Sequence, residues 1–276
     1  MSPGPLLSFG LFADAHCGPR VHGDRCCPDS LGKLERCLEA FNARQLPLAM
    51  QLGDLVHGGD AAEDREYLLR ARQTCGRFQG AMHTVLGNHD VAALTKAEFL
   101  AQGAREVRGP YYSFDAGPLH FAVLDGNCHE DGSDFTAGDL EWDQAWVSPA
   151  QVAWLEDDLR RSGGRRTIVL CHENLDDRRW EGQSDPHVAR NAAEVRAVLE
   201  RAGSVSAVIQ AHYHPGARTV VNGIPYLTLT AMVTGPGETN NAYAIAHVGE
   251  DGALTIEGVG RQESARVERT GGGWAR

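Results

Sequence analysis

The stretch Thr84-Val85-Leu86-Gly87-Asn88-His89-Asp90 joins an apolar run to a turn that carries an amide, an imidazole and a carboxylate. The apolar run is typical of a buried strand, and the glycine marks the point where that strand ends. Gly-Asn by itself is ordinary turn chemistry. The stretch gains meaning because other apolar runs also end in residue types that bind metals, namely Asp14-Ala15-His16, Gly53-Asp54, Cys171-His172 and Ala211-His212-Tyr213-His214.

Five strands that deliver carboxylate, amide and imidazole groups at one edge of an α/β sheet are expected to build a metal site with two ions. In Asp14-Ala15-His16 and in His212-Tyr213-His214 the two potential ligands are two residues apart, so they share one face of an extended chain. Any one of these motifs, taken alone, is more often a surface turn or a structural histidine. Their joint order along the chain is far more specific.

Composition and charge narrow the class of protein. The chain has 276 residues, of which 42% are hydrophobic and 23% charged, as is usual for a globular protein. Its formal net charge of −11 argues against binding a nucleic-acid polymer or an anionic membrane. A phosphorylated substrate remains compatible with that charge, because two divalent cations invert the local field.

The cysteines and the terminus predict a cytoplasmic protein. Seven cysteines, an odd number with no Cys-x-x-Cys pair, indicate reduced thiols in a reducing compartment. The sequence shows no signal-peptide pattern at its N-terminus and no apolar stretch long enough to span a membrane.

Strand and helix patterns alternate through residue 210, and strand patterns alone follow, which favours an α/β sheet packed on a second sheet. We expect helices to start at Ser30, Asp60, Ser148 and Asn191, each a residue type that caps helices. The loops 17–29, 126–147 and 173–190 are polar and carry no readable code for specificity. We expect one domain over residues 1–263 and a loosely ordered tail over 264–276.

The ordered set Asp-x-His, Gly-Asp, Gly-Asn-His-Asp, His and His-x-His resembles the five motif blocks of the calcineurin-like metallophosphoesterase family, from about Phe9 to His214. Within that family the sequence is most similar to the manganese-dependent ADP-ribose/CDP-alcohol diphosphatase branch. This closer similarity lies in Phe9-Gly-Leu-Phe-Ala-Asp14, Met50-Gln-Leu-Gly-Asp54 and Gly258-Val-Gly-Arg261. The resemblance implies a four-layer α/β/β/α sandwich of two mixed β-sheets flanked by helices.

The resemblance also implies a site with two divalent metal ions. Mixed nitrogen and oxygen ligands suit Mn, Fe or Zn, and Mn is favoured by the similarity to the manganese-dependent branch. One ion would be held by Asp14, His16, Asp54 and His214, and the other by Asp54, Asn88, His172 and His212, so that Asp54 bridges both. His89 would face the leaving group, and Asp90 would orient His89 and raise its pKa.

The activity implied is hydrolysis of a phosphodiester or diphosphate bond in a small nucleotide-like substrate by a metal-bridging hydroxide. A general phosphomonoesterase and a cyclic-nucleotide phosphodiesterase are the alternatives on the same site. A non-catalytic scaffold is disfavoured because all the ligand positions are present, and a mononuclear hydrolase is disfavoured by the bridging Asp54. Arg25 and His57 are the candidate substrate contacts.

The sequence departs from the family pattern at three places. Ala211 replaces the glycine that usually begins the last block, and Glu173-Asn174 replaces small apolar residues after His172. The loop before the first helix lacks the Tyr/Arg-rich run of the diphosphatase branch, and only Arg25 is left as a phosphate contact.

Overall fold

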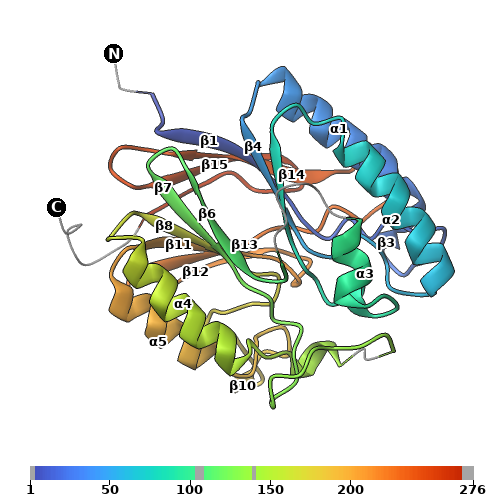
Figure 1. Ribbon diagram of the computed structural model, residues 1–276. Coiled ribbons are helices and arrows are strands. Elements are labelled where there is room, and N and C mark those ends of the chain that lie inside the picture. The colour runs from blue at the N-terminus through green and yellow to red at the C-terminus, as the bar shows by residue number, and fades with distance from the viewer. Residues whose placement is uncertain (1–3, 103–108, 139–140, 269–276) are drawn as a thin grey trace.

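Two mixed six-stranded sheets pack face to face, with helices on their outer faces (Figure 1). The computed structural model describes residues 4–102, 109–138 and 141–268. Helices α1 and α2 cover one sheet, and α4 and α5 cover the other (Figure 1). The predicted four-layer α/β/β/α fold is therefore confirmed.

The first sheet has the strand order β16-β15-β14-β1-β4-β5. β1, β4 and β5 run parallel, whereas β14, β15 and β16 add antiparallel to β1. Parallel neighbours need a crossover, and α1 (Ser30–Ala43) and α2 (Ala61–Cys75) provide the two crossovers here. The strands are β1 (Leu7–Phe12), β4 (Leu48–Leu52), β5 (Ala81–Val85), β14 (Ala242–Val248), β15 (Leu254–Gly260) and β16 (Ala265–Val267).

The second sheet has the strand order β12-β13-β11-β8-β7-β6. β7, β8, β11 and β13 run parallel, and the edge strands β6 and β12 are antiparallel to their neighbours. Its crossover helices are α4 (Pro149–Arg161) and α5 (Ala192–Ala202). The strands are β6 (Tyr112–Ala116), β7 (Leu119–Val123), β8 (Thr167–Leu170), β11 (Val205–Gln210), β12 (Ala217–Val221) and β13 (Ile224–Thr228).

Several smaller elements lie in the loops to which the sequence assigned no structure. The loop 17–29 contains β2 (Val21–His22), β3 (Arg25–Cys26) and the 3₁₀ turn η1 (Cys27–Asp29). The hairpin of β9 (Arg179–Trp180) and β10 (Gln183–Ser184) lies in the loop 173–190. The remaining elements are η2 (His89–Val91), α3 (Lys96–Ala101) and η3 (Trp142–Gln144).

The space between the sheets is filled by apolar side chains that point inward from both. Phe9 of β1 and Phe121 of β7 pack edge to face, with ring centroids 5.5 Å apart. Both rings are fully buried. Because side chains alternate across a strand, the opposite faces of these strands pack against the helices and form two further cores. The shared inner core fixes the two sheets relative to each other.

Two further expectations from the sequence concern the C-terminal tail and membrane-spanning segments. Residues 265–267, within the predicted loose tail, form β16 and pair with β15, while residues 269–276 lie outside the described range. No helix among the described residues is long and apolar enough to cross a bilayer.

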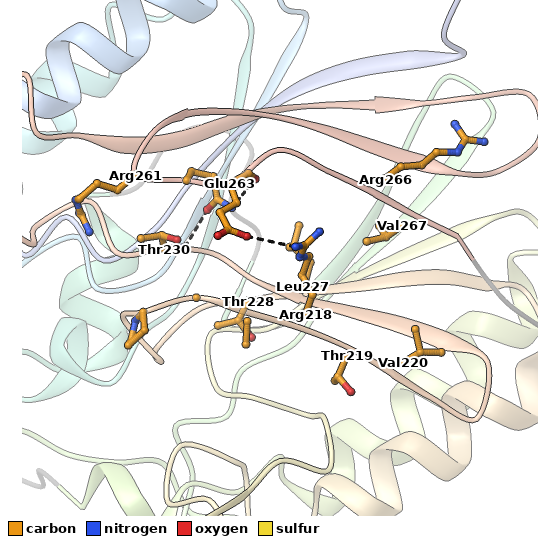
Figure 2. A pocket seen from close by; sticks show the side chains of 14 residues that line it. Arg218, Thr219, Val220, Leu227, Thr228, Thr230, Arg261, Glu263, Arg266 and Val267 are labelled. Carbon is orange, nitrogen blue, oxygen red and sulfur yellow. Dashed lines mark hydrogen bonds and ion pairs between the residues drawn. The ribbon is translucent and has the colours of Figure 1, made fainter.

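A groove of about 590 Å³ lies between the edge strand β12 and residues 261–267. Arg218 on one side of this groove forms an ion pair with Glu263 on the other (Figure 2).

Candidate metal centre

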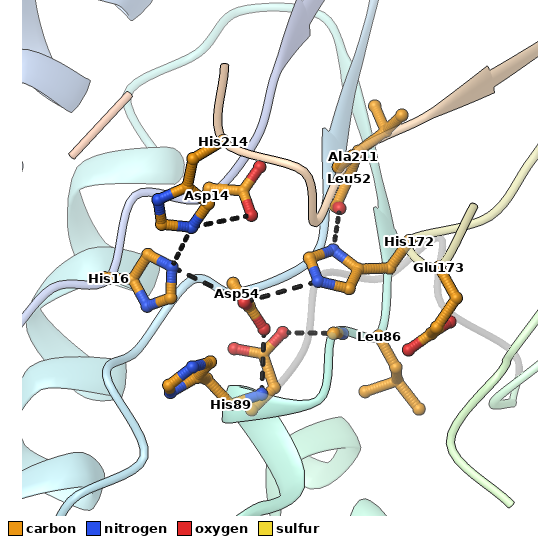
Figure 3. Close-up of polar contacts among 12 residues, drawn as sticks. Asp14, His16, Leu52, Asp54, Leu86, His89, His172, Glu173, Ala211 and His214 are labelled. Atoms are coloured by element: carbon orange, nitrogen blue, oxygen red, sulfur yellow. Dashed lines mark hydrogen bonds and ion pairs between the residues drawn. The ribbon is translucent and has the colours of Figure 1, made fainter. Parts of the chain in front are cut away.

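The ends of five parallel strands bring the predicted ligands to one place. Asp14, His16, Asp54, His172 and His214 point toward a common centre between the two sheets (Figure 3). Asp14 and Asp54 follow β1 and β4 of the first sheet, and His172 follows β8 of the second. Both sheets therefore contribute to one site, as the order of motifs in the sequence predicts.

Two groups of ligand atoms form within this centre. Asp14, His16 and His214 make one group, and Asp54, His172 and His212 make the other, with the ligand atoms of each group within 4.8 Å of one another. Oδ2 of Asp54 lies 3.5 Å from Nε2 of His16 and 3.3 Å from Nε2 of His172, so this carboxylate faces both groups. These groups contain six of the seven residues that the family resemblance implies as ligands, the exception being Asn88.

The backbone at these ligands is held in conformations that L-residues rarely adopt. Asp14, His16, Asp54 and His212 have φ values of 53°, 45°, 54° and 67°. Residues other than glycine with positive φ cluster at functional sites, because the surrounding structure must compensate for the strain. Gly53 also has positive φ, and a side chain at that position would collide with the imidazole of His172. Glycine is thus required before Asp54, because the backbone has positive φ there and because a side chain would collide with His172.

Several buried ligand atoms lack a partner, which tests whether a metal fits the site. Within the described residues, no hydrogen bond reaches the carboxylate oxygens of Asp14, Oδ1 of Asn88 or Nε2 of His212. A buried polar atom left unpaired costs about 1–3 kcal/mol. The Nε2 atoms of His16 and His214 also lie 3.2 Å apart. They can form a hydrogen bond with each other only if one of the two nitrogens carries a hydrogen. Cations between these atoms would satisfy all of them, so the residues fit a metal centre.

Burial keeps three of the four ligand histidines neutral and therefore available as ligands. It lowers the pKa of His16 and His212 well below the usual value, and that of His214 to about 3. A neutral imidazole is the form that binds a metal. Burial also lowers the pKa of His172, but the adjacent Asp54 carboxylate outweighs it and raises that pKa well above the usual value. The same lack of solvent raises the pKa of Asp14 to about 8.

Contacts behind the ligands orient the rings. Nδ1 of His172 donates to the carbonyl of Leu52 at 2.7 Å, which directs Nε2 toward Asp54. Nδ1 of His89 donates to the carbonyl of His57. Second-sphere hydrogen bonds of this kind fix the tautomer of a histidine.

Asp90 has a different role from the one that the family resemblance implies. Its carboxylate accepts hydrogen bonds from the amides of Leu55, Val56 and Gly87, at 2.8, 3.1 and 3.1 Å. Asp90 thus joins the turn after β4 to the turn after β5, and His57 holds the His89 ring instead. Burial lowers the pKa of His89, although the Asp54 carboxylate opposes this shift. Burial is therefore the main influence on the pKa of His89 in this arrangement.

The centre opens into a cavity of about 200 Å³ that the sequence predicts only in part. Its lining includes Arg25, whose Nη1 lies 3.2 Å from Nε2 of His89. His57, the other candidate substrate contact, lies behind His89, and its ring stacks on that of His22. Trp142 and His187, to which the sequence analysis assigned no role in the site, line the cavity from the loops 126–147 and 173–190. The one general signal for these two residues is that polar loops next to strand ends often carry functional side chains.

Comparison with known proteins agrees with this geometry. Residues 7–216 match the family described as calcineurin-like phosphoesterase. A dimetal phosphatase from Danio rerio is similar in structure with a TM-score of 0.82 at 20% sequence identity, over 96% of this chain and 100% of that one. No curated protein sequence matches the chain significantly.

Two further solved structures share the fold at lower similarity. The purple acid phosphatase PPD1 from Lupinus luteus has a TM-score of 0.63 and 14% identity, over 97% of this chain and 55% of that one. GAP50, described as the anchor in the inner membrane complex of Plasmodium, has a TM-score of 0.61 and 11% identity, over 95% and 88% of the two chains. The matched region and the converging ligands lead to one conclusion: this chain belongs to the calcineurin-like phosphoesterase family of hydrolases, which depend on two divalent metal ions.

Proposed function

We propose that this hydrolase cleaves a phosphodiester or diphosphate bond in a small nucleotide-like substrate, with Mn²⁺ as the native metal. The observation that carries the proposal is the convergence of unpaired ligand atoms from both sheets beside a cavity that contains one arginine and two histidines outside the ligand set. The order of motif blocks and their similarity to the manganese-dependent diphosphatase branch support the choice of substrate and metal.

We assign the two metal positions to the ligand groups described above, with Asn88 completing the second group. When bound, two divalent cations polarise phosphoryl oxygens and lower the pKa of a water molecule. The residues of the chain supply orientation and charge. Asp54 faces both groups, and its Oδ1 accepts a hydrogen bond from the amide of His89 at 2.8 Å. The carboxylate therefore links the metal positions to the turn that carries His89.

Arg25 and His89 act on the substrate in this proposal. The guanidinium of Arg25 stays charged and matches the geometry of a phosphate. His89 is next to Arg25, and in its imidazolium form it would donate the Nε2 proton to the leaving oxygen while Nδ1 keeps its hydrogen bond to the carbonyl of His57. Both act without binding metal.

The position of Arg25 is fixed by a buried lysine. The backbone of Arg25 pairs with Thr234 in an isolated bridge. Nζ of the fully buried Lys33 donates to the carbonyls of Met232, Val233, Thr234 and Gly235, at 3.1, 3.1, 3.3 and 2.7 Å. Lys33 thereby holds the segment against which Arg25 lies.

We also infer a reducing location, the cytoplasm, from the thiols. All seven cysteines are buried and unpaired. Proteins of oxidising compartments usually convert such a number of cysteines into disulfides.

The proposal is tested by hydrolysis with protein that has been stripped of metal and reloaded with Mn²⁺, Zn²⁺ or Mg²⁺. The substrates are ADP-ribose, CDP-choline, cyclic AMP, bis-p-nitrophenyl phosphate and p-nitrophenyl phosphate. We expect Mn²⁺-dependent turnover of the first two to exceed that of the other three. The stripped protein serves as the control.

Each alternative gives a different result in the same assay. Preferential turnover of p-nitrophenyl phosphate would show a phosphomonoesterase, and preferential turnover of cyclic AMP would show a cyclic-nucleotide phosphodiesterase. Absence of turnover with every metal and substrate would refute the proposal.

A further inference from the structure

Two aromatic side chains form one wall of the cavity, and neither is a metal ligand in the family pattern. The ring of Trp142 lies 5.1 Å from that of His187 and 5.7 Å from that of His212. The ring of His187 lies 5.0 Å from that of His212. These two residues thus lie beside the second ligand group, whereas Arg25 contacts His89 near the first.

The cavity is too small to enclose a nucleotide. Its volume is about 200 Å³, below the roughly 300–1,000 Å³ of pockets that enclose whole small-molecule ligands. A reacting phosphate held with the metals would fill this cavity, so the rest of the substrate would lie across its rim. Trp142 is at this rim, with 36% of its surface exposed although it lines the cavity.

The aromatic wall is held by the backbone of both loops. Nδ1 of His187 donates at 2.7 Å to Asp185, which is itself buried. The carbonyl of His187 accepts from the amide of Asn174, two residues after His172, at 3.0 Å. This fixes the ring of His187 relative to the metal centre.

Trp142 is connected to the same part of the chain. Three residues after it, the carbonyl of Ala145 accepts from the amide of Arg190 at 2.8 Å, and the amide of Val147 donates to Oδ1 of Asn191 at 3.0 Å. Residues 190 and 191 follow His187 closely, so one anchored segment positions both rings.

We propose that Trp142, backed by His187, is a stacking subsite for the planar base of a nucleotide whose phosphate is bound at the metal centre. Aromatic side chains bind a base through its π face, which every base has. This wall would therefore favour substrates that contain a base but would not discriminate between different bases. The inference rests on the proposed function because the base must be joined to the reacting phosphate. The base is the part of the substrate that the metal centre alone does not recognise.

The test compares two ligands that differ only by the base, AMP and ribose 5-phosphate, on the metal-loaded protein by isothermal titration calorimetry. We expect the wild-type protein to bind AMP about 10-fold more tightly or better, as a stacked base typically provides. Trp142→Ala should reduce this preference to about two-fold or less, and Trp142→Phe should retain most of it. Trp180→Ala is the matched control, since Trp180 is an exposed tryptophan outside the cavity lining.

A second readout does not depend on affinity. Stacking of a base on Trp142 should quench tryptophan fluorescence when AMP is added, and Trp142→Phe should lose this quenching while Trp180→Phe keeps it. Metal content and circular dichroism confirm that each variant is folded and loaded.

The subsite is refuted if Trp142→Ala keeps the wild-type preference for AMP, or if the wild-type protein has no preference. Hydrolysis of bis-p-nitrophenyl phosphate by the wild-type protein separates the two hypotheses. Turnover without a base preference would refute the stacking subsite and support the proposed hydrolase activity. A Trp142-dependent preference without turnover of any ester would keep the subsite and remove the proposed function.

Discussion

Asp54 is the residue at which the two ligand groups meet. Its Oδ2 faces His16 and His172, and its Oδ1 accepts from the amide of His89. We expect Asp54→Asn to reduce the metal content from two ions to one or fewer, and to lower kcat by more than about 100-fold, the upper end of losses seen for residues that only support a ligand. Metal content is measured by plasma mass spectrometry after dialysis.

Asp60→Asn is the matched control for this change. Asp60 is close in sequence, but its side chain caps α2 by accepting from the amides of Ala62 and Glu63. This variant should keep both metals. A fully active Asp54→Asn protein with two ions would show that the carboxylate does not bridge.

His89 is assigned to the leaving group, and its effect should depend on that group. We expect His89→Asn to keep the metal content and to lower kcat by about 10²–10⁴-fold for poor leaving groups, as for loss of a general acid. The loss should be smaller for p-nitrophenyl esters, whose leaving group needs little protonation. The measurement is kcat on ADP-ribose and on bis-p-nitrophenyl phosphate. His22→Asn is a control at an exposed histidine, and an unchanged kcat on both substrates would exclude His89 from the reaction.

The sequence predicts single residues of the site where local chemistry identifies them. Asp14, Asp54 and His172 were recognisable because each follows an apolar run, and strand ends meet at one edge. Trp142 and His187 were not recognisable, because their position depends on hydrogen bonds between two distant loops. The contact between Asp90 and the turn after β4 is also long-range, and the motif gives no indication of it.

Among the elements, prediction from sequence was best where a pattern is local. The turn Asn222-Gly223 joins β12 to β13 with both residues at positive φ, as the dipeptide predicts. Ser148 caps α4 by accepting from the amide of Gln151 at 3.3 Å. Ser30 instead begins α1 without capping it. Asn191 makes no cap hydrogen bond, because its side chain bonds to Val147 of the neighbouring loop. A tertiary contact thus explains the exception at Asn191.

A charged network joins β6 and β7 to α4 and should make stability depend on pH. His120 of β7 lies 2.8 Å from both Asp115 of β6 and Asp158 of α4, and Arg165 pairs with Asp115. Burial lowers the pKa of His120, but hydrogen bonds to the two carboxylates outweigh it and raise this pKa. A raised pKa means that the stabilisation is full below the ordinary value near 6.5 and is lost as the pH rises through the folded-state value.

We therefore expect His120→Gln to lower the free energy of unfolding by about 1 kcal/mol at pH 5.5, in the range of an ordinary intramolecular hydrogen bond. The difference from wild type should shrink at pH 8.5, because the stabilisation by protonated His120 is lost as the pH rises through its folded-state pKa. Urea denaturation at the two pH values measures it. A difference that grows with pH would contradict the charged network.

At the scale of the whole molecule, the metal centre joins two sheets that otherwise meet through their apolar faces. Asp14, Asp54 and Asn88 follow strands of the first sheet, and His172, His212 and His214 follow strands of the second. Because each proposed ion takes ligands from both sheets, the bound ions hold the layers together. This arrangement also supports the proposal that residues 1–263 form one domain.

Metal binding should consequently stabilise the whole chain in one step. A ligand at 100 times its Kd that binds only the folded state adds about 2.7 kcal/mol per site, which raises Tm by roughly 5–10 °C in a protein of this size. We expect differential scanning calorimetry of the stripped protein to show one transition that moves upward by at least this amount on adding Mn²⁺ and returns with a chelator. Asp54→Asn should show a smaller shift under the same conditions. Two separate transitions, only one of which responds to Mn²⁺, would mean that the sheets unfold independently and that the metals are held by one of them.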